Sequence, residues 1–318
     1  MTKRRTTARI PRTRGWGLAL ALATACISGV AIFVNAHFVG KVGDATAYTT
    51  AKNAVAAALL LGVLGAGAIG RRGRGRATRR VGARGWAGLV ALGVIGGSVP
   101  FVLFFEGLAR AASPVQAGFI HKTLVVWVAL LAVPLLRERF TAAHAGAIVL
   151  LVAGQAVLVA DFASFQFGIG EAMVLAATLL WSVEFVLAKR LLDSTGSLTV
   201  GAARLGIGIL LLGGYVLASG RAGAMAALTG QEWTWAVVTG VILAGFVASW
   251  YAALARAQAI DVTAVLVFGQ VVTAALAAGF TGVSLQPDLV GLGLILAGVA
   301  AAGLGALRVG APAGASTT

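Results

Sequence analysis

The sequence predicts an all-helical integral membrane protein of about ten transmembrane helices in two inverted five-helix repeats. Of its 318 residues 59% are hydrophobic and only 11% are charged, whereas soluble domains carry about a quarter charged residues. Its mean hydropathy is +0.94, and apolar runs long enough to cross a bilayer recur throughout. Motifs of the first half also return in the second. A water-soluble globular protein is therefore excluded.

Each membrane span needs roughly 20 apolar residues. The first apolar run follows a basic stretch, as in a signal peptide, but it is longer than the apolar core of such a peptide, so we expect it to remain as a helix. Charged and turn-forming residues delimit ten expected spans, at 16–36, 46–69, 86–109, 114–136, 142–160, 168–188, 198–219, 234–255, 262–281 and 289–307.

The positive charge is placed as in a membrane protein. The net charge is +15, and Lys and Arg cluster at Lys3 to Arg14 and at Arg71 to Arg84, next to apolar runs. With the N-terminus inside, 19 Lys and Arg residues fall on the inner side and 3 on the outer side. This bias predicts cytoplasmic termini in the cell membrane. It also favours anionic membrane lipids as partners, rather than nucleic acid.

An internal repeat connects the two halves. The segment FEGLARAASPVQAG at 105–118 shares LARA with YAALARAQAIDVTA at 251–264, and IFVNA at 32–36 resembles EFVLA at 184–188. Because each half holds five spans, the second half must enter the membrane inverted. The expected organisation is a basic cytoplasmic tail (1–15), a first repeat (16–160), an inverted second repeat (161–307) and a short cytoplasmic tail (308–318). Such repeats with a site between them are typical of secondary transporters.

Ionisable residues inside spans are the first candidates for function, because each costs about 2.5 to 3.5 kcal/mol at a helix centre. Lys122 lies roughly 12 Å below the outer boundary, near the midplane of a core about 30 Å thick. We expect it to contact substrate, or else to pair with Glu106 or a helix-end carbonyl. The candidates in or beside the spans are Lys52, Glu106, His121, Lys122, Glu184 and Arg204.

Counting charges suggests how these residues pair. Pairs of Lys52 with Glu106 and of Glu184 with Arg204 would leave Lys122 as a surplus cation, which favours an anionic or zwitterionic ligand. Glu106 and Glu184 would then serve coupling or gating. Alternatively, Lys52 extends to the interface, and Glu106 pairs with Arg110 one turn away.

Aromatic residues gather on four spans and could line a pocket for the apolar part of a substrate. Lipid contact and interfacial anchoring are the alternatives. Pro100 and Pro134 lie inside spans, where a kink can serve gating or only packing. The aromatic candidates are Trp127, Trp181, Trp250 and Tyr251, with Phe101, Phe104, Phe105, Phe185 and Phe246 nearby in sequence.

The sequence shows no signature of catalysis. It lacks HExxH and GxxxxGK[ST] motifs, its three histidines are scattered at 37, 121 and 144, and Cys26 is its only cysteine. We therefore expect a small-molecule substrate and no catalytic residues, metal or cofactor. A membrane enzyme, a lipid-handling protein or a scaffold is the alternative class.

The segment FVLFFEGLARAASPVQAGFIHKTLVVWVALLAVPLLRERF, at 101–140, resembles the EamA-type transporters of the drug/metabolite transporter superfamily, and the resemblance extends over about 16–307. Glu138 stands where the family's fourth helix ends in a Glu, whereas Ser284 stands at the matching place of the second repeat. The resemblance implies a central cavity reached alternately from each side, with export or uptake of amino acids, related metabolites or toxic compounds. Export is the favoured direction. It also assigns the family's positive residue in helix two or seven to Lys52 and Arg204.

Overall fold

The computed structural model describes residues 12–37, 39, 42–72, 81–159 and 165–309, and their regular structure is helical. Most of the predicted tails, most of the basic segment 71–84 and the junction of the repeats at 160–161 lie outside these residues, whereas α1 already begins at Arg12, inside the predicted N-terminal tail. The helices are α1 (Arg12–His37), α2 (Ala45–Arg72), α3 (Ala83–Gly97), α4 (Val99–Arg110), α5 (Pro114–Lys122), α6 (Leu124–Leu136), α7 (Ala142–Val159), α8 (Ile169–Leu192), α9 (Ser197–Ala218), α10 (Ala222–Ala226), α11 (Gly230–Leu254), α12 (Ala259–Leu266), α13 (Gly269–Thr281) and α14 (Leu289–Val309), with a 3-10 turn η1 (Gln286–Asp288).

Among the described residues, ten helical stretches are long and apolar enough to cross a membrane, as predicted. Their boundaries shift by a few residues where local chemistry extends a helix. The eighth span begins at Gly230 instead of 234, because the Thr229 side chain accepts from Glu232 N and the Glu232 carboxylate accepts from Thr229 N. This reciprocal cap satisfies two amides that the first turn would otherwise leave without partners.

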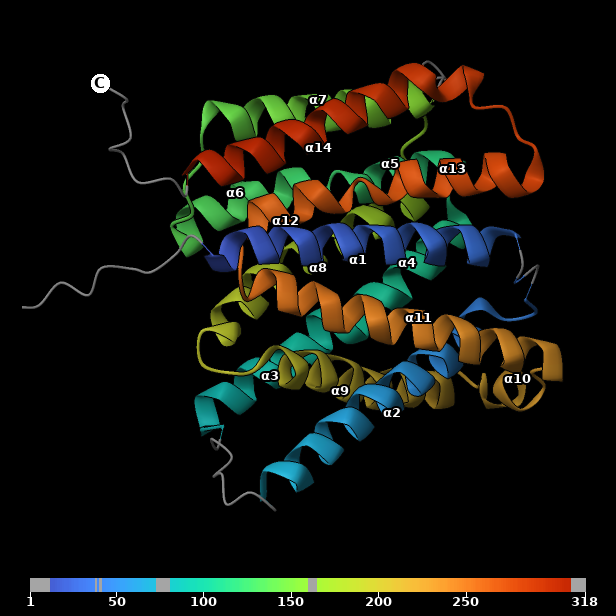
Figure 1. Cartoon of the computed structure of the whole chain (residues 1–318). Helices are drawn as coiled ribbons and strands as arrows, with labels where there is room; N and C mark the ends of the chain where they lie inside the picture. Colours follow the sequence, from blue (N-terminus) through green and yellow to red (C-terminus); the bar gives the residue numbers. More distant parts are fainter. Residues whose placement is uncertain (1–11, 38, 40–41, 73–80, 160–164, 310–318) are drawn as a thin grey trace, which may run out of the picture.

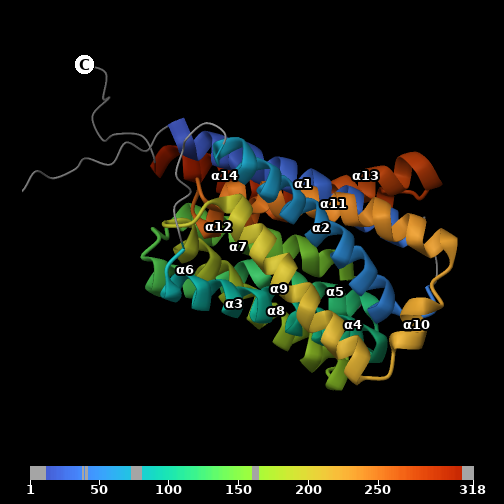
Figure 2. The same ribbon diagram turned by 90° about the horizontal axis from the view of Figure 1, so that it is seen from below.

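The spans form one bundle, with α7 and α14 side by side along one edge and α3 packed on α9 towards the opposite edge (Figure 1). The helix α8 is the most enclosed span, and it packs against α3, α4, α5 and α6. The helix α1 begins and α14 ends on the same side of the bundle (Figure 1). We call this the termini side, and the opposite the far side. In Figure 2 α1, α11 and α2 run along one another, in line with their packing.

Three of the ten spans are interrupted. The third span breaks at Ser98 between α3 and α4, the fourth at Thr123 between α5 and α6, and the ninth at Val267 and Phe268 between α12 and α13. The fourth and ninth spans correspond in the repeat, and they break at nearly matching positions: a shift of 146 residues carries Thr123 onto Gly269, the residue that follows the break at Val267 and Phe268. Discontinuous helices near the bilayer midplane are where inverted-repeat transporters build their sites.

Close packing of glycines brings the third and seventh spans together. A Cβ on Gly97 would lie 2.2 Å from the backbone oxygen of Arg204, and one on Gly208 would lie 2.5 Å from the oxygen of Gly97. Only residues without a side chain permit this approach of two backbones in lipid. The contact places Arg204 beside the break in the third span.

Candidate functional site

The site begins at the break in the third span. Pro100 has no N–H, so the carbonyl of Gly96, four residues earlier, loses its helical donor. The buried indole of Trp181 replaces that donor, because Trp181 Nε1 donates to Gly96 O at 3.2 Å. The Ser98 hydroxyl donates to the carbonyls of Gly93 and Val94 at 3.2 and 3.1 Å. The interruption is therefore satisfied by side chains, and it links α3 to α8.

Next to this break lies a buried ion pair. Glu184 Oε1 is 3.5 Å from Arg204 Nε, and the Tyr251 hydroxyl donates to the same oxygen at 2.5 Å. Gly96 leaves room for the pair, since a Cβ there would meet Glu184 Cγ at 2.4 Å. The pairing of Glu184 with Arg204 expected from the sequence is confirmed. The second carboxylate oxygen of Glu184 is buried and has no hydrogen-bond partner among the described residues.

A cluster of rings joins the ion pair to the far half of the bundle. The Arg204 guanidinium lies 5.7 Å from the centre of the Phe101 ring, and Trp181 contacts Phe101, Phe104 and His121 with ring centres 5.0 to 5.6 Å apart. Phe105 stacks on Phe101 at 6.4 Å. These ring separations are typical of favourable aromatic pairs. The structure thus brings together Trp181, His121, Arg204 and Tyr251.

Lys52 reaches the same ring cluster from α2. Its Nζ lies 5.9 Å from the ring centres of both Tyr48 and Phe105, close enough for attraction between a cation and the ring faces. The next residue, Asn53, is buried, and neither polar atom of its amide has a hydrogen-bond partner among the described residues. A partly buried cation and a buried, unsatisfied amide are therefore consecutive residues of α2.

The predicted pairing of Lys52 with Glu106 is wrong. Glu106 instead binds Arg110 one turn away at 2.5 Å, which was the alternative prediction, and it also binds Arg221 at 2.6 Å. The hydrogen bond with Glu106 raises the pKa of Arg221 above its usual value. Arg221 also donates to Thr46 Oγ1 at 2.9 Å. Glu106 thus belongs to a network on the far side of the bundle, outside the ring cluster.

Lys122 is the last residue of α5, directly before the break in the fourth span. Its side chain is partly buried, and no ion pair or hydrogen bond of its ammonium is found within the described part of the chain. His121 beside it contacts Trp181 and Phe104. Lys122 therefore directly follows a residue of the ring cluster, and no carboxylate among the described residues pairs with its ammonium.

Two of the four aromatic candidates, Trp250 and Trp127, have their described contacts outside the ring cluster. Trp250 stacks on Phe246 and lies 4.6 Å from the Phe185 ring, and its buried indole N–H has no partner among the described residues. The Trp127 indole donates at 3.0 Å to Thr123, in the break of its own span. Trp250 thus contacts Phe185, the residue after Glu184, and precedes Tyr251 in sequence. Trp127 has no described contact with Glu184, Arg204 or Tyr251.

Glu138 belongs to the connection between α6 and α7, and its side chain lies against the first residues of α12. Its carboxylate accepts from the backbone N–H groups of Ala259 and Ile260 at 2.6 and 3.1 Å, which is how an anion is held at a helix N-terminus. Burial raises the pKa of Glu138 above its usual value, although these two hydrogen bonds oppose the rise. Glu138 thus ties the end of the fourth span to the start of the ninth on the termini side.

Sequence reasoning missed a second polar group on the termini side. Asp261 is fully buried, and it binds Arg14 at 2.7 Å and His144 at 3.0 Å. Lys189 lies nearby and donates to the carbonyls of Leu254 and Ala257. Asp261 and His144 each sit within a few residues of an expected span boundary, so the sequence offered no reason to treat them as intramembrane charges.

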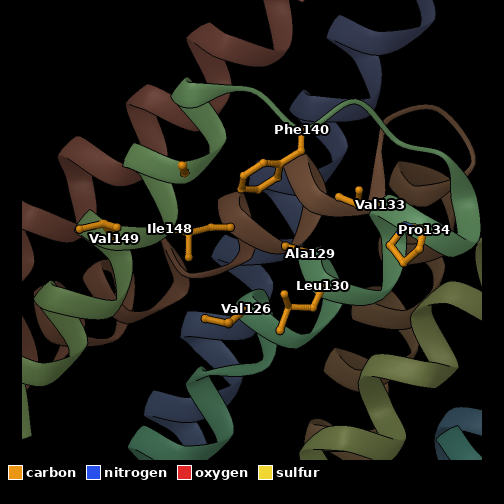
Figure 3. Close-up of a pocket in the computed structure, with 9 residues that line it drawn as sticks. Val126, Ala129, Leu130, Val133, Pro134, Phe140, Ile148 and Val149 are labelled. Atoms are coloured by element: carbon orange, nitrogen blue, oxygen red, sulfur yellow. The ribbon is translucent and has the colours of Figure 1, made fainter.

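A groove of about 450 Å³ opens between α6 and α7 (Figure 3). Its lining is apolar, from Val126 and Leu130 on α6 to Phe140 and Val149. Leu130 and Val149 are 59% and 66% exposed, so this groove faces the surroundings of the bundle. It offers nothing to bind the polar part of a metabolite, and it is separate from the ring cluster.

Comparison with known families identifies the chain. A family model described as the EamA-like transporter family matches residues 15–160 and again residues 168–304. The chain belongs to the EamA-like transporter family. The two matches show that the EamA-like unit occurs twice, as the resemblance of the sequence implied.

The fold also has solved counterparts. A chain titled "Crystal structure of protein" matches with a TM-score of 0.74 and 19% identity, covering 92% of this chain and 99% of that chain, and 29 chains of solved structures match in all. At this identity the likeness concerns the fold alone. No curated protein matches the chain. Membership in the EamA-like family makes the chain a multi-pass membrane transporter.

Proposed function

We propose that this EamA-like protein exports a small metabolite with a carboxylate or zwitterionic group across the cytoplasmic membrane by alternating access. The observation that carries the proposal is the pair of lysines at the ring cluster, Lys52 and Lys122, which have no ion-pair partner among the described residues. Cations in the interior of a membrane bundle are costly and mark substrate or ion pathways.

The arrangement suits a ligand with two ends. The carboxylate would take charge-assisted hydrogen bonds from Lys52 or Lys122, each worth about 1.5 to 3 kcal/mol. Its apolar part would lie against Phe101, Phe105 and Trp181, whose rings already contact one another. The unsatisfied amide of Asn53 offers a further donor and acceptor at the Lys52 end.

In this proposal the interrupted helices are the parts of the bundle that move. The fourth span carries Lys122 at its interruption, and the third span breaks beside Glu184 and Arg204. A helix that is already interrupted can bend there with little loss of hydrogen bonding. Glu184 and Glu138, each holding contacts between spans, are the proposed coupling and gating residues.

A binding experiment tests the proposal. Thermal unfolding of the purified protein should shift upward with some anionic or zwitterionic metabolites of a panel, and Lys122→Met should weaken apparent affinity by roughly ten- to a hundredfold. Lys122→Arg should retain part of the binding. Arg256→Met is the matched control, because Arg256 is exposed in the turn after α11 and, among the described residues, its side chain donates to the carbonyl of Ala252 alone. Unchanged affinity of Lys122→Met for a ligand that the protein transports would contradict the role of Lys122.

A further inference from the structure

The buried group around Asp261 is built from three elements on the termini side. Arg14 of α1 is 8% exposed, His144 of α7 is 1% exposed, and Asp261 of α12 is fully buried. Arg14 Nη2 also donates to Gln258 at 3.1 Å. These contacts join the first, fifth and ninth spans at one point, and the proposed substrate site does not use them.

The geometry fixes the protonation state of His144. The backbone N–H of Thr141 donates to His144 Nδ1 at 3.0 Å, and the Thr141 hydroxyl lies 2.9 Å from the same nitrogen. Nδ1 must therefore present a lone pair, so the hydrogen of a neutral ring resides on Nε2. Nε2 then donates to Asp261 Oδ1 at 3.0 Å. The Thr141 N–H contact thus requires an unprotonated Nδ1, whereas the hydroxyl can either donate to that nitrogen or accept from it.

A proton on Nδ1 would be incompatible with the contact from the Thr141 backbone N–H. The new N–H would face the Thr141 N–H at 3.0 Å, so an attractive contact would become a repulsive one. His144 also lies in the first turn of α7, where the helix dipole disfavours a positive charge. The ring would have to turn, or the start of α7 would have to move, and either change separates α7 from Asp261.

The surrounding charges determine what else titrates here. Glu138 and Lys189 both interact electrostatically with Asp261, and burial raises the pKa of Glu138. Of the helices packed on α7, α5 carries His121 and Lys122, α12 carries only Asp261, and α14 carries only Arg308, whose side chain is not among those described. An experiment must therefore distinguish proton uptake by Glu138 from proton uptake by His144.

We propose that His144 and Asp261 form a proton-binding site whose occupation opens the termini side of the bundle. The proton comes from water on that side and goes to His144 Nδ1. The Thr141 N–H then loses its acceptor, and the contact between α7 and α12 is released. The arrangement in which Nδ1 accepts from the Thr141 N–H is therefore lost when the ring takes up this proton. Proton binding would then drive transport, a step that rests on the proposed function.

Nitrogen NMR of the full chain labelled with ¹⁵N-histidine tests the site directly in nanodiscs. Only three histidines occur in the chain, so loss of one signal in His144→Gln assigns the resonance. At pH 7.5 we expect a neutral ring with its hydrogen on Nε2. A charged ring, or a hydrogen on Nδ1, would overturn the proposal. The measurement needs no substrate, so it stands whether or not the proposed transport is found.

Hydrogen exchange tests the opening. Protection of amides in 138–147 and 257–264 should fall roughly tenfold between pH 7.5 and 5.5, after correction for intrinsic exchange. In His144→Gln, whose amide can still donate to Asp261 without titrating, protection should not change with pH. His37→Gln, at the other end of α1, should behave as the unmodified protein. Equal loss of protection in His144→Gln and the unmodified chain would assign the response to Glu138 or Asp261 and refute the role of His144.

Discussion

At the scale of residues, one side chain replaces a backbone hydrogen-bond donor that is missing at the break in the third span. Pro100 deprives Gly96 O of its helical donor, and the Trp181 indole supplies another from α8. Because the carbonyl is buried at this break, its hydrogen bond fixes the position of α8 relative to α3. The same indole ring packs on Phe101 and Phe104, so one side chain supports both the break and the ring cluster.

Trp181→Phe should therefore destabilise the protein through the lost hydrogen bond. Phe keeps one aromatic ring but loses the five-membered ring and its N–H, so Gly96 O is left buried without a donor, which costs about 1 to 3 kcal/mol, and the smaller ring adds a loss of packing. Thermal unfolding in detergent measures the loss. Trp233→Phe is the control, since Trp233 is 41% exposed and its change should have little effect. A Trp181→Phe protein as stable as that control would show that Gly96 O finds another donor.

Glu184 and Arg204 should behave as one unit. Their side chains are buried, with exposed fractions of 0% and 9%, so removing one partner leaves an uncompensated charge and costs about 3 to 5 kcal/mol. Glu184→Gln and Arg204→Met should each lower stability or activity, and the double variant should lose less than the sum. The charge swap Glu184→Arg with Arg204→Glu should restore part of the loss. Additive effects in this cycle would mean that the two groups are not coupled.

The residue pairs show how far charge counting reaches. The Glu184 pair was predictable, because the two residues occupy consecutive spans at similar depth. The Lys52 pair was not, because Glu106 finds Arg221 in the connection between α9 and α11. A loop residue is unconstrained by depth in the membrane, so counting charges inside spans omits it. Lys52 packs instead against aromatic rings.

At the scale of elements, the interruptions of the spans decide where the site lies. Pro100 indicated a bend in the third span, and the helix breaks two residues before it at Ser98. Pro134 lies inside α6, whereas the fourth span breaks at Thr123. Proline marks a lost hydrogen bond, but a helix also breaks where a side chain enters its hydrogen-bond ladder, and at this break the Thr123 hydroxyl donates to the carbonyl of Ile120 at 2.6 Å. The matching break of the fourth and ninth spans therefore emerged only in three dimensions.

The contact between α3 and α9 should depend on the absence of side chains. Gly208→Ala places a Cβ 2.5 Å from Gly97 O, which forces the helices apart and should cost about 1 to 3 kcal/mol. Gly213→Ala is the matched control on the same helix, because no atom lies within 4 Å of its added Cβ. That variant should be neutral or gain up to about 1 kcal/mol. Thermal unfolding compares the two, and equal stabilities would show that the contact is loose.

At the scale of the whole molecule, an even number of spans brings the N-terminal end of α1 and the C-terminal end of α14 to the same side of the bundle. The distribution of Lys and Arg predicts that this side is cytoplasmic. A fluorescent reporter that folds only in the cytoplasm should glow when fused after residue 318, and a phosphatase active only outside should work when fused after Ser284. Activity in the reverse pattern would invert the orientation and assign the His144 site to the outer face.

The sequence by itself determined the class of protein, the ten spans, the twofold repeat and most of the charged residues of the ring cluster. This was possible because the bilayer acts on each helix separately: a span must be apolar and long enough, and a charge within it is conspicuous. Only the tertiary structure decided which side chains meet. The triad of Arg14, His144 and Asp261 depends on how three helices from distant parts of the chain are rotated and shifted against each other, and those displacements follow from packing between helices, which no local pattern encodes.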